Sequence, residues 1–362
     1  MARKKHRVGI VGLGFGRAHI PAFQANGCEV VAVCQRNQET ARAVAARYHV
    51  PAVFERWEDL LEQARPDIVV IASPPSLHRE IALRAFAQGA HVLCEKPVAM
   101  TAAEGREMVE AAARAQRVGM TSFNWRFIPA MQRFHALVEE GVVGRLFHAT
   151  GRWLGARAAD EAAPATWRMD RAVAGHGAMG DMGVHVIDLV RWSFGEFARV
   201  CAQAGVAYPT RTAPGGRPAD AEDFCSVIAQ LASGGQVTLS VSRAARGASE
   251  QFLEAYGSQG SLVYRVDREK AKWYVGELRA AGASGTLQPV AVRAGLPRSA
   301  GEGDQMEVTG KATIAPLVKR FLDGIRKGES PSPSLEDGVR AQLVLDAVLR
   351  SLRDGGWQRI EA

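Results

Sequence analysis

The sequence predicts a two-part α/β protein: an N-terminal doubly wound parallel sheet, then an α+β domain with a large, mostly antiparallel, open sheet. In the first third of the chain, short apolar runs alternate with helical segments, as parallel strands buried on both faces do. From residue 145 onward strand-like runs predominate, and Gly-Ser turns join several of them. Because 362 residues are many for one domain, we expect domains at 1–123 and 124–334 and a C-terminal helix at 335–362 that packs back on the body.

The first strand, residues 7–11, leads into a glycine-rich turn and then a helix. Gly12 and Gly14 fill the first two positions of the G-x-G-x-x-G/A fingerprint, but the sixth position is an arginine and Gly16 comes one place early. Backbone N–H groups of such a turn, here including Phe15, can bind a pyrophosphate together with the N-terminus of the following helix. The turn therefore predicts a dinucleotide site, although a glycine-rich turn without a ligand is the alternative.

The end of the second strand, residues 29–34, bears on the choice of cofactor. An acid at this point would bind the ribose hydroxyls of NAD, but the chain has Gln35 and Arg36. Arg36 could pair with a 2′-phosphate, which favours NADP slightly over NAD. The alternative is that Arg36 is solvated and that Gln35 hydrogen-bonds the ribose of NAD.

Two further strands, at 67–72 and 90–94, end in loops stiffened by proline. Ligands bind at the carboxyl ends of the strands in such sheets, so we expect cofactor contacts from these loops. With a last strand at 118–122, the pattern predicts a six-stranded parallel sheet. The residues that follow the two strands are Ser73, Pro74, Pro75 and His78, and then Glu95, Lys96 and Pro97.

In the second domain, one helical segment at about 177–194 interrupts the strands and carries an acid and an imidazole. Asp181 and His185 are four residues apart, so a helix places them on one face, one turn apart. The acid could then orient the ring and raise its basicity. The alternative is a structural pair, in which a helix-start acid contacts a core histidine. Strands are expected at 146–153, 200–207, 223–231, 236–241, 252–256 and 262–266, helices at 129–140, 314–326 and 335–353, and an exposed excursion at 280–303.

Composition excludes several classes of function. The net charge of +7 is spread along the chain, without the basic-aromatic interleaving of nucleic-acid binders, and it favours acidic or phosphorylated ligands. No apolar run is long enough to span a membrane, and the basic residues 1–6 lead directly into a strand, which predicts a short frayed tail and a cytoplasmic protein. The five cysteines form no C-x-x-C pair, so we expect no zinc site or disulfide framework.

These motifs together resemble the glucose-fructose oxidoreductase / inositol dehydrogenase (Gfo/Idh/MocA) family over nearly the whole chain. The most specific segment is Cys94-Glu95-Lys96-Pro97, which is similar to the family's E-K-P motif. The other matching segments are the Ser73–His78 loop, Phe123 to Pro129, Trp167-Arg168, Gly175 to His185, and Pro333 to Gln342.

The resemblance implies a Rossmann domain, an NAD(P) cofactor and hydride transfer between nicotinamide and a secondary alcohol or ketone of a sugar, polyol or related cyclic compound. It implies that His185 is the general base, that Lys96 holds the substrate oxygen and that Asp181 orients the base or the substrate. Glu95 would contact the cofactor ribose or support Lys96. Further expected contacts are Asn124 with the cofactor, and Arg126, Trp167, Arg168 and His176 with the substrate; for Asn124 and Arg126 the alternative is a brace at the domain junction.

The same resemblance leaves two other functions open and implies an assembly. The enzyme could use tightly bound NAD(P) transiently, with elimination or hydrolysis and no net redox change, or the chain could be a non-catalytic nucleotide-binding sensor. The open face of the second sheet needs a cover, which predicts a homodimer or homotetramer. No metal is expected.

Overall fold

The computed structural model describes residues 5–282 and 285–361. These fall into two compact units, Met1–Asn124 with Leu296–Val339, and Trp125–Gly295 with Arg340–Ala362. The sequence placed 296–334 in the second domain, but Asn26 donates to the carbonyl of Ala315 across 3.0 Å within the first unit. Of the expected basic tail, residues 1–4 lie outside the described residues, as do residues 283 and 284 of the expected excursion.

The first unit is built on the predicted parallel sheet, which has six strands in the order β3-β2-β1-β4-β5-β6. This confirms the doubly wound arrangement, whose direction of winding reverses between β1 and β4. The sequence did not locate β3, because this edge strand has only three half-buried residues. The strands are β1 (Arg7–Val11), β2 (Glu29–Cys34), β3 (Ala52–Phe54), β4 (Ile68–Ile71), β5 (His91–Cys94) and β6 (Gly119–Thr121).

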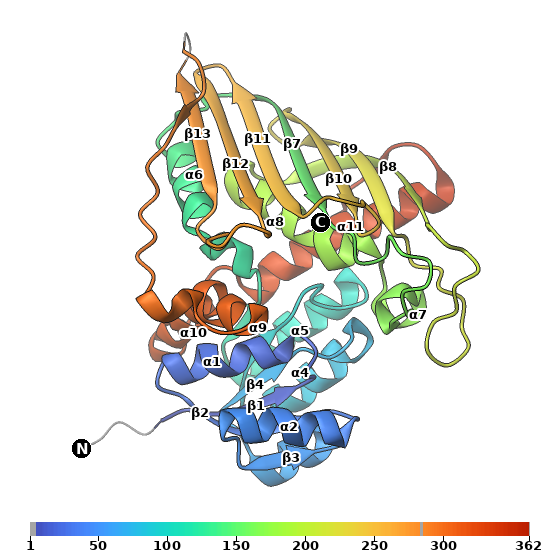
Figure 1. Ribbon diagram of the computed structural model, residues 1–362, viewed down its shortest axis with the longest axis vertical. Coiled ribbons are helices and arrows are strands. Elements are labelled where there is room, and N and C mark those ends of the chain that lie inside the picture. The colour runs from blue at the N-terminus through green and yellow to red at the C-terminus, as the bar shows by residue number, and fades with distance from the viewer. Residues whose placement is uncertain (1–4, 283–284, 362) are drawn as a thin grey trace. The chain divides into compact units, whose positions relative to one another are not determined.

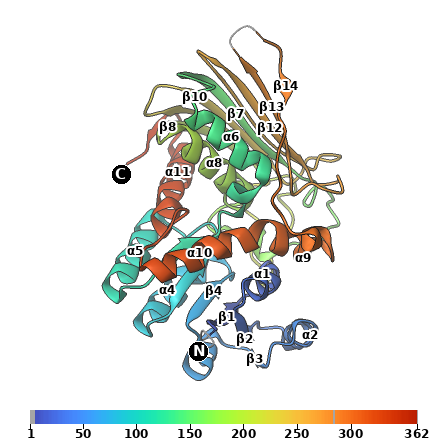
Figure 2. The same cartoon turned by 90° about the vertical axis from the view of Figure 1, so that its left-hand side faces the viewer.

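Helices cover both faces of this sheet. Figure 2 shows α4 and α5 on one face and α1 and α2 on the other. At the start of α5, the hydroxyl of Thr101 accepts a hydrogen bond from the amide of Glu104, as the Thr-x-x-Glu pattern predicts. The helices are α1 (His19–Ala25), α2 (Gln38–Tyr48), α3 (Trp57–Asp59), α4 (His78–Ala87), α5 (Ala102–Ala115), α9 (Gln305–Thr309) and α10 (Ala315–Lys327).

The second unit is built on a nine-stranded sheet in the order β14-β13-β12-β11-β7-β10-β9-β8-β15. Strands β7 and β10 pair in parallel, and the other neighbours among the described residues are antiparallel, which confirms the prediction of a mostly antiparallel sheet. The strands are β7 (Leu146–Leu154), β8 (Phe197–Gly205), β9 (Phe224–Leu231), β10 (Gln236–Ser242), β11 (Glu250–Gly257), β12 (Gly260–Asp267), β13 (Glu277–Gly282), β14 (Gln288–Pro289) and β15 (Gln358–Arg359).

Helices α6 (Pro129–Glu139) and α8 (Val184–Phe194) lie on one face of this sheet (Figures 1 and 2). The packing is close: a Cβ on Gly151 of β7 would come within 2.3 Å of Val186 of α8. On β9, buried and exposed side chains alternate, so the opposite face of this strand is open to solvent.

The segment that carries Asp181 and His185 is not one regular α-helix. Met179–Gly183 form a π-helical turn, which continues directly into α8. Asp181 therefore lies in the π turn and His185 in the α-helix, so the one-turn α spacing expected from the sequence does not describe the pair. Single π turns inside helices occur frequently at functional sites.

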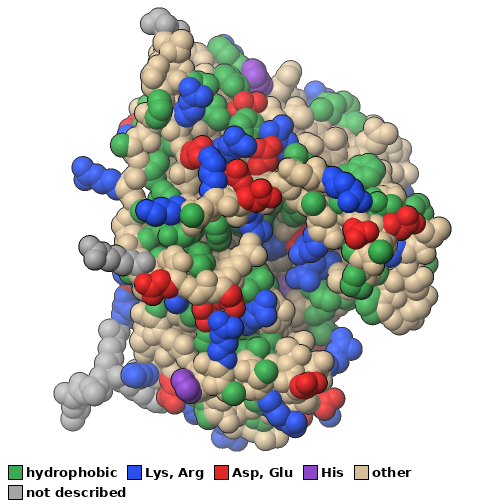
Figure 3. All heavy atoms as spheres, in the orientation of Figure 1, with side chains coloured by type: hydrophobic (Ala, Val, Ile, Leu, Met, Phe, Trp, Pro, Cys, Tyr) green, Lys and Arg blue, Asp and Glu red, His purple; other side chains and the backbone are tan. Residues whose placement is uncertain are grey.

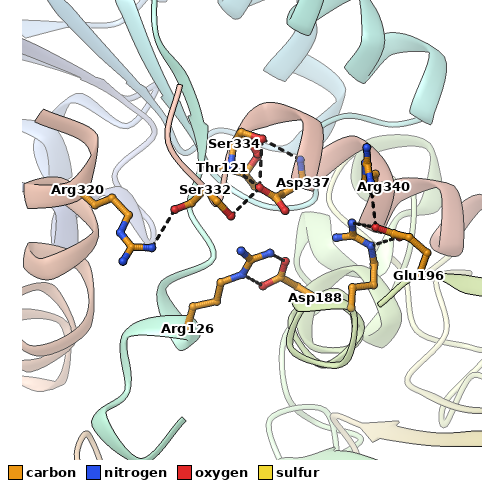
Figure 4. A network of polar contacts seen from close by, with 10 residues as sticks. Thr121, Arg126, Asp188, Glu196, Arg320, Ser332, Ser334, Asp337 and Arg340 are labelled. Atoms are coloured by element: carbon orange, nitrogen blue, oxygen red, sulfur yellow. Dashed lines mark hydrogen bonds and ion pairs between the residues drawn. The ribbon is translucent and has the colours of Figure 1, made fainter. Parts of the chain in front are cut away.

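Arg126 forms a buried ion pair, so its guanidinium is not exposed to solvent. Its guanidinium donates to both carboxylate oxygens of Asp188 on α8, at 2.7 and 2.5 Å (Figure 4). The side chains are 3% and 1% exposed, and the guanidinium also lies over the ring of Trp192. Arg126 was expected to contact the substrate. Its Nε and Nη2 instead donate to Asp188, so its role here is structural.

Helix α11 (Leu335–Asp354) begins with a polar cap. The carboxylate of Asp337 accepts hydrogen bonds from the hydroxyl of Ser332 and from the amide of Ser334 (Figure 4). A Cβ on Gly338 would lie 2.5 Å from the hydroxyl of Thr121, so a glycine is needed for this close approach.

The surface drawn in Figure 3 carries basic and acidic side chains in mixture. Within the described part of the chain, no helix is long and apolar enough to cross a membrane. The same residues contain no group of three or more His, Cys, Asp or Glu side chains suited to a metal ion.

Candidate functional site

The glycine turn has the geometry of a phosphate-binding loop. Gly12 has a φ of +91°, and a Cβ there would lie 2.4 Å from the carbonyl oxygen of Ala72 at the end of β4. A Cβ on Gly14 would meet nothing within 4 Å, so the space beside this residue is open. A Cβ on Gly16 would press on the side chain of Ala72 at 3.0 Å. Gly16 thus provides the close packing usually provided by the third glycine, although it comes one place early.

Gln35 and Arg36 follow β2 and differ in what they do. The side-chain oxygen of Gln35 accepts a hydrogen bond of 3.2 Å from the amide of Leu13, so Gln35 braces the glycine turn. Arg36 is exposed. Phe15 lies in the same turn, half-buried, with its ring edge toward His19 at a centroid distance of 6.1 Å.

The two proline loops are joined by His78. Its Nε2 lies 2.9 Å from the carbonyl oxygen of Ser73 and its Nδ1 lies 2.9 Å from that of Pro97. Pro74 caps and Pro75 begins the short 3-10 helix that follows Ser73. Since both ring nitrogens face backbone carbonyls, His78 positions the loops that were expected to contact the cofactor.

Glu95 forms a buried pair with His19, which the sequence reasoning missed. The Nε2 atom of His19 lies 2.8 Å from a carboxylate oxygen of Glu95, and the two side chains are 0% and 7% exposed. Burial alone would raise the pKa of Glu95, but the hydrogen bond and charge of His19, together with the charge of Lys96, hold this pKa below its usual value. Glu95 is therefore a carboxylate beside Lys96, which is half-buried.

Asn124 is 2% exposed and donates to the hydroxyl of Thr313 at 2.8 Å. The hydroxyl of Thr313 in turn donates to the carbonyl of Thr309 in α9. The amide of Asn124 thus binds a segment nearly two hundred residues later, within the first unit. This segment packs beside the glycine turn, because a Cβ on Gly310 would lie 2.2 Å from the carbonyl oxygen of Ala18. The expected contact of Asn124 with the cofactor stays a prediction.

In the second unit, Glu222 anchors the segment that carries Asp181 and His185. Its carboxylate accepts hydrogen bonds from the amides of Gly177 (2.8 Å) and Met179 (3.2 Å), and its carbonyl accepts one from Ala178 (2.7 Å). A Cβ on Gly177 would lie 1.9 Å from the carbonyl oxygen of Glu222. A 2%-exposed carboxylate therefore satisfies the first free N–H groups of the helical segment.

Asp181 is bound by two arginines. Arg157 donates to one carboxylate oxygen, and the Nε of Arg168 lies 3.6 Å from the other. The guanidinium of Arg168 also lies 4.3 Å from the centre of the Trp167 ring. The structure thus brings together Asp181, Arg168 and Trp167, all expected from the sequence, and adds Arg157.

His185 lies in an aromatic environment. Its ring centroid is 5.4 Å from that of Trp153 and 6.3 Å from that of Trp125, and Trp125 packs on Trp273 at 5.8 Å. His185 is 3% exposed and the three tryptophans are 6–8% exposed. An imidazole with such neighbours suits proton transfer to an apolar-faced ligand.

His176, expected at the substrate, is 2% exposed. Its Nε2 lies 3.4 Å from the side-chain nitrogen of Gln342 on α11. Burial lowers the pKa of His176 to about 4; the charge of Asp346 acts in the opposite direction, and the charge of Arg171 lowers the pKa further. His176 is therefore a neutral core residue and not an extra proton donor at an open site.

Sequence reasoning missed five residues that shape these regions. His19, Arg157 and Glu222 each meet a partner far away in the chain, so no local spacing could reveal them. One signal existed for His19, which directly follows the glycine turn at the first position of α1. The residues are His19, Arg157, Glu222, Trp273 and Arg268, the last with its guanidinium over the Trp273 ring.

The chain matches known families over most of its length. Residues 6–123 match a family described as "Oxidoreductase family, NAD-binding Rossmann fold", and residues 131–263 match the "GFO/IDH/MocA C-terminal domain".

Individual proteins are similar along the whole chain. Levoglucosan dehydrogenase of Pseudarthrobacter phenanthrenivorans is 31% identical, over 97% of this chain and 97% of that protein. Inositol 2-dehydrogenase of Rhizobium meliloti is 27% identical, over 96% and 97%. The solved structure of levoglucosan dehydrogenase in complex with NADH and levoglucosan superposes with a TM-score of 0.87 at 29% identity, covering 99% of this chain and 100% of that one.

Replacing Glu222 tests the anchor of the helical segment. Glu222→Ala removes the acceptor of two buried amides, so we expect the peptide spanning 177–185 to exchange its amide hydrogens about two- to thirtyfold faster. Loss of a helix cap costs about 0.5–2 kcal/mol. Glu222→Gln keeps an acceptor oxygen and should restore most of the protection, measured by hydrogen–deuterium exchange. Equal exchange in the wild type and the alanine variant would contradict the anchor.

His176 should make the second unit sensitive to acid. Because its folded pKa of about 4 lies below the ordinary 6.5, only the unfolded chain binds a proton between these pH values. Its contribution to the free energy of unfolding is present above pH 6.5 and falls by about 3 kcal/mol toward pH 4.

When the pH is lowered from 7 to 5, the melting temperature of the His176→Asn variant should fall less than that of the wild type. Differential scanning calorimetry measures both. His49→Asn, at an exposed histidine, is the control. If the His176→Asn and wild-type curves kept a constant separation over this range, the assignment of a neutral buried His176 would be wrong.

Proposed function

We propose that this chain, which belongs to the GFO/IDH/MocA family of NAD-binding oxidoreductases, transfers a hydride between nicotinamide and a secondary alcohol or ketone of a sugar, polyol or related cyclic compound. The family and its relatives make the chain an NAD-dependent oxidoreductase of CH–OH groups, of the sugar and polyol dehydrogenase type. The observation that carries the finer proposal is His185, held against Trp125 and Trp153 on a helix whose start is fixed by Glu222.

His185 is the proposed general base. An alcohol that loses a hydride must also lose its hydroxyl proton, and a positioned imidazole is suited to accept it near neutral pH. The tryptophans beside the ring offer flat apolar surfaces on which the C–H face of a cyclic polyol can pack. In the reverse direction, the protonated ring returns the proton to the alkoxide.

Lys96 and Asp181 complete the proposed set. Lys96 supplies a positive charge for the alkoxide that develops as the proton leaves, and the Glu95 carboxylate beside it favours the ammonium form. Asp181, which is paired with Arg157 and Arg168, orients a substrate hydroxyl or the ring of His185. Arg168, which lies beside Asp181, and Trp167, which lies beside Arg168, are the further proposed substrate contacts.

The glycine turn fits a dinucleotide. When bound, the nicotinamide supplies a hydride acceptor at C4. The space beside Gly14 is open and would hold the pyrophosphate, and the hydrogen bond between the amide of Leu13 and Gln35 keeps the turn in place. NAD is the cofactor that the family description and the NADH-bound neighbours support. We propose that exposed Arg36 extends use to NADP by pairing with its 2′-phosphate; a preference for NADP has no support.

The dehydrogenase proposal predicts a specific loss of turnover. With NAD⁺ and a panel of polyols and sugars, the purified chain should reduce the cofactor, followed by absorbance. Lys96→Ala and His185→Ala should each lower kcat/KM by about 10²–10⁴-fold, the usual range for losing a charge stabiliser or a general base.

The matched controls are Lys319→Ala and His49→Asn, at exposed positions of the first unit. Activity retained within threefold in both site variants would remove these residues from the mechanism. Product formed without net cofactor reduction would point instead to transient use of the cofactor.

We also propose that the open face of the nine-stranded sheet joins copies of the chain. On β9, Phe224 and Ile228 are 44% and 50% exposed, and large exposed apolar side chains on a sheet face mark association sites.

Light scattering at micromolar concentration should give a mass at least twice the 38.9 kDa of one chain, and Ile228→Lys should shift it toward the monomer. A monomeric mass for the wild type would contradict the assembly.

A further inference from the structure

Several acids of the second unit pair with arginines, and Asp181 has two arginine partners, as Glu196 and Glu250 also do. Most buried acids of this unit pair with one arginine each, which balances their charge. Asp181 is bound by both Arg157 and Arg168. The one-to-one pairs are Arg126–Asp188, Arg217–Asp170, Arg171–Glu222 and Arg243–Asp223.

Arg268 adds a third positive charge without an acid of its own. It follows β12, is half-buried, and forms no ion pair with a carboxylate among the described residues. Its Nε is buried with no hydrogen-bond partner. Its guanidinium lies 5.4 Å from the centre of the Trp273 ring, and Trp273 packs on Trp125, the neighbour of His185.

Electrostatics link Arg268 to the same group of charges. Burial lowers the pKa of Arg268, the positive charge of Arg157 lowers it further, and Asp181 acts in the opposite direction. Burial also lowers the pKa of Arg168, which Asp181 raises and Arg157 lowers. Guanidinium groups stay protonated in proteins, so three cations share the field of one carboxylate.

An excess of this kind is costly unless a ligand compensates it. Removing a guanidinium from water without a counter-charge is unfavourable, and leaving its N–H without an acceptor adds to the cost. Arginine presents a planar fork of donors that matches carboxylate and phosphate oxygens. A bound anion would satisfy the Nε of Arg268 and reduce the repulsion between Arg157 and Arg268.

We propose that the substrate carries an anionic oxygen group, a carboxylate or a phosphate ester, in addition to its reacting alcohol, and that Arg268 with Arg157 binds this group. This inference rests on the proposed dehydrogenase function, because it concerns the substrate of that same site. It names acidic sugars and polyols, such as uronates, aldonates or sugar phosphates, as the substrate class.

The test compares neutral and acidic sugars that share a ring. Full-length protein saturated with NAD⁺ is assayed with D-glucose, D-glucuronate and D-glucose 6-phosphate, and with D-galactose and D-galacturonate. At least one acidic member should have a kcat/KM at least tenfold above its neutral counterpart, and the two kinds of acid distinguish a carboxylate from a phosphate ester. A charge-assisted pair accounts for a difference of about ten- to hundredfold.

Arg268→Gln should lower kcat/KM for the acidic sugar at least tenfold, mainly through KM, and for the neutral sugar less than threefold. Arg265→Gln is the matched control, because Arg265 lies three residues earlier on β12 and pairs with Glu250. The inference would be overturned if the neutral sugar were preferred in every pair. It would also be overturned if Arg268→Gln changed only the dissociation constant of the dinucleotide. Either result would leave the dehydrogenase function intact.

If no sugar reacts, tryptophan fluorescence of the NADH-bound protein is titrated with glucuronate and with inorganic phosphate. Saturable binding that Arg268→Gln abolishes would support the anion site and overturn the dehydrogenase function. Absence of binding would overturn both.

Discussion

The carboxylate of Glu222 holds the start of the helical segment on which the second unit's chemistry depends. It satisfies the amides of Gly177 and Met179, and its own carbonyl binds Ala178. The contact is possible only because Gly177 lacks a side chain. From this fixed start, the π turn directs Asp181 toward Arg157 and Arg168, and α8 carries His185 against the tryptophans. A buried anion at a helix start also opposes the helix dipole favourably, so the same group serves geometry and electrostatics.

The first unit uses the same principle at the carboxyl ends of its strands. His78 joins the loop after β4 to the loop after β5 through two backbone carbonyls. His19, at the start of α1, pairs with Glu95, so the glycine turn and the Glu95-Lys96-Pro97 loop are held in one arrangement. Each of these contacts is shielded from solvent, and the His19–Glu95 pair joins segments 76 residues apart. Such pre-organisation keeps binding groups in position before a ligand arrives.

Sequence patterns predicted the architecture well, because alternation of apolar runs and helices depends on local spacing. They predicted the parallel sheet, the mostly antiparallel sheet and the helix around His185. They missed β3, a three-residue edge strand, and the π turn, which leaves no mark in residue spacing. Arg126 was expected at the substrate, but its partner Asp188 lies far along the chain, and only the fold reveals that they meet. His176 looked available as a proton donor until burial placed it in the core. Arg268 gave no signal, because an unpaired arginine is recognised only from its surroundings.

The central claim is that the chain transfers a hydride to and from a carbon of a cyclic polyol or sugar. The most direct measurement supplies NADH that carries deuterium at both C4 positions to the purified protein with a mixture of keto-sugars, and identifies labelled products by mass spectrometry. The account predicts one deuterium at the reduced carbon of at least one product, and labelling at least about a hundredfold slower with His185→Ala. Binding of NADH without deuterium in any product of the wild-type protein would contradict it.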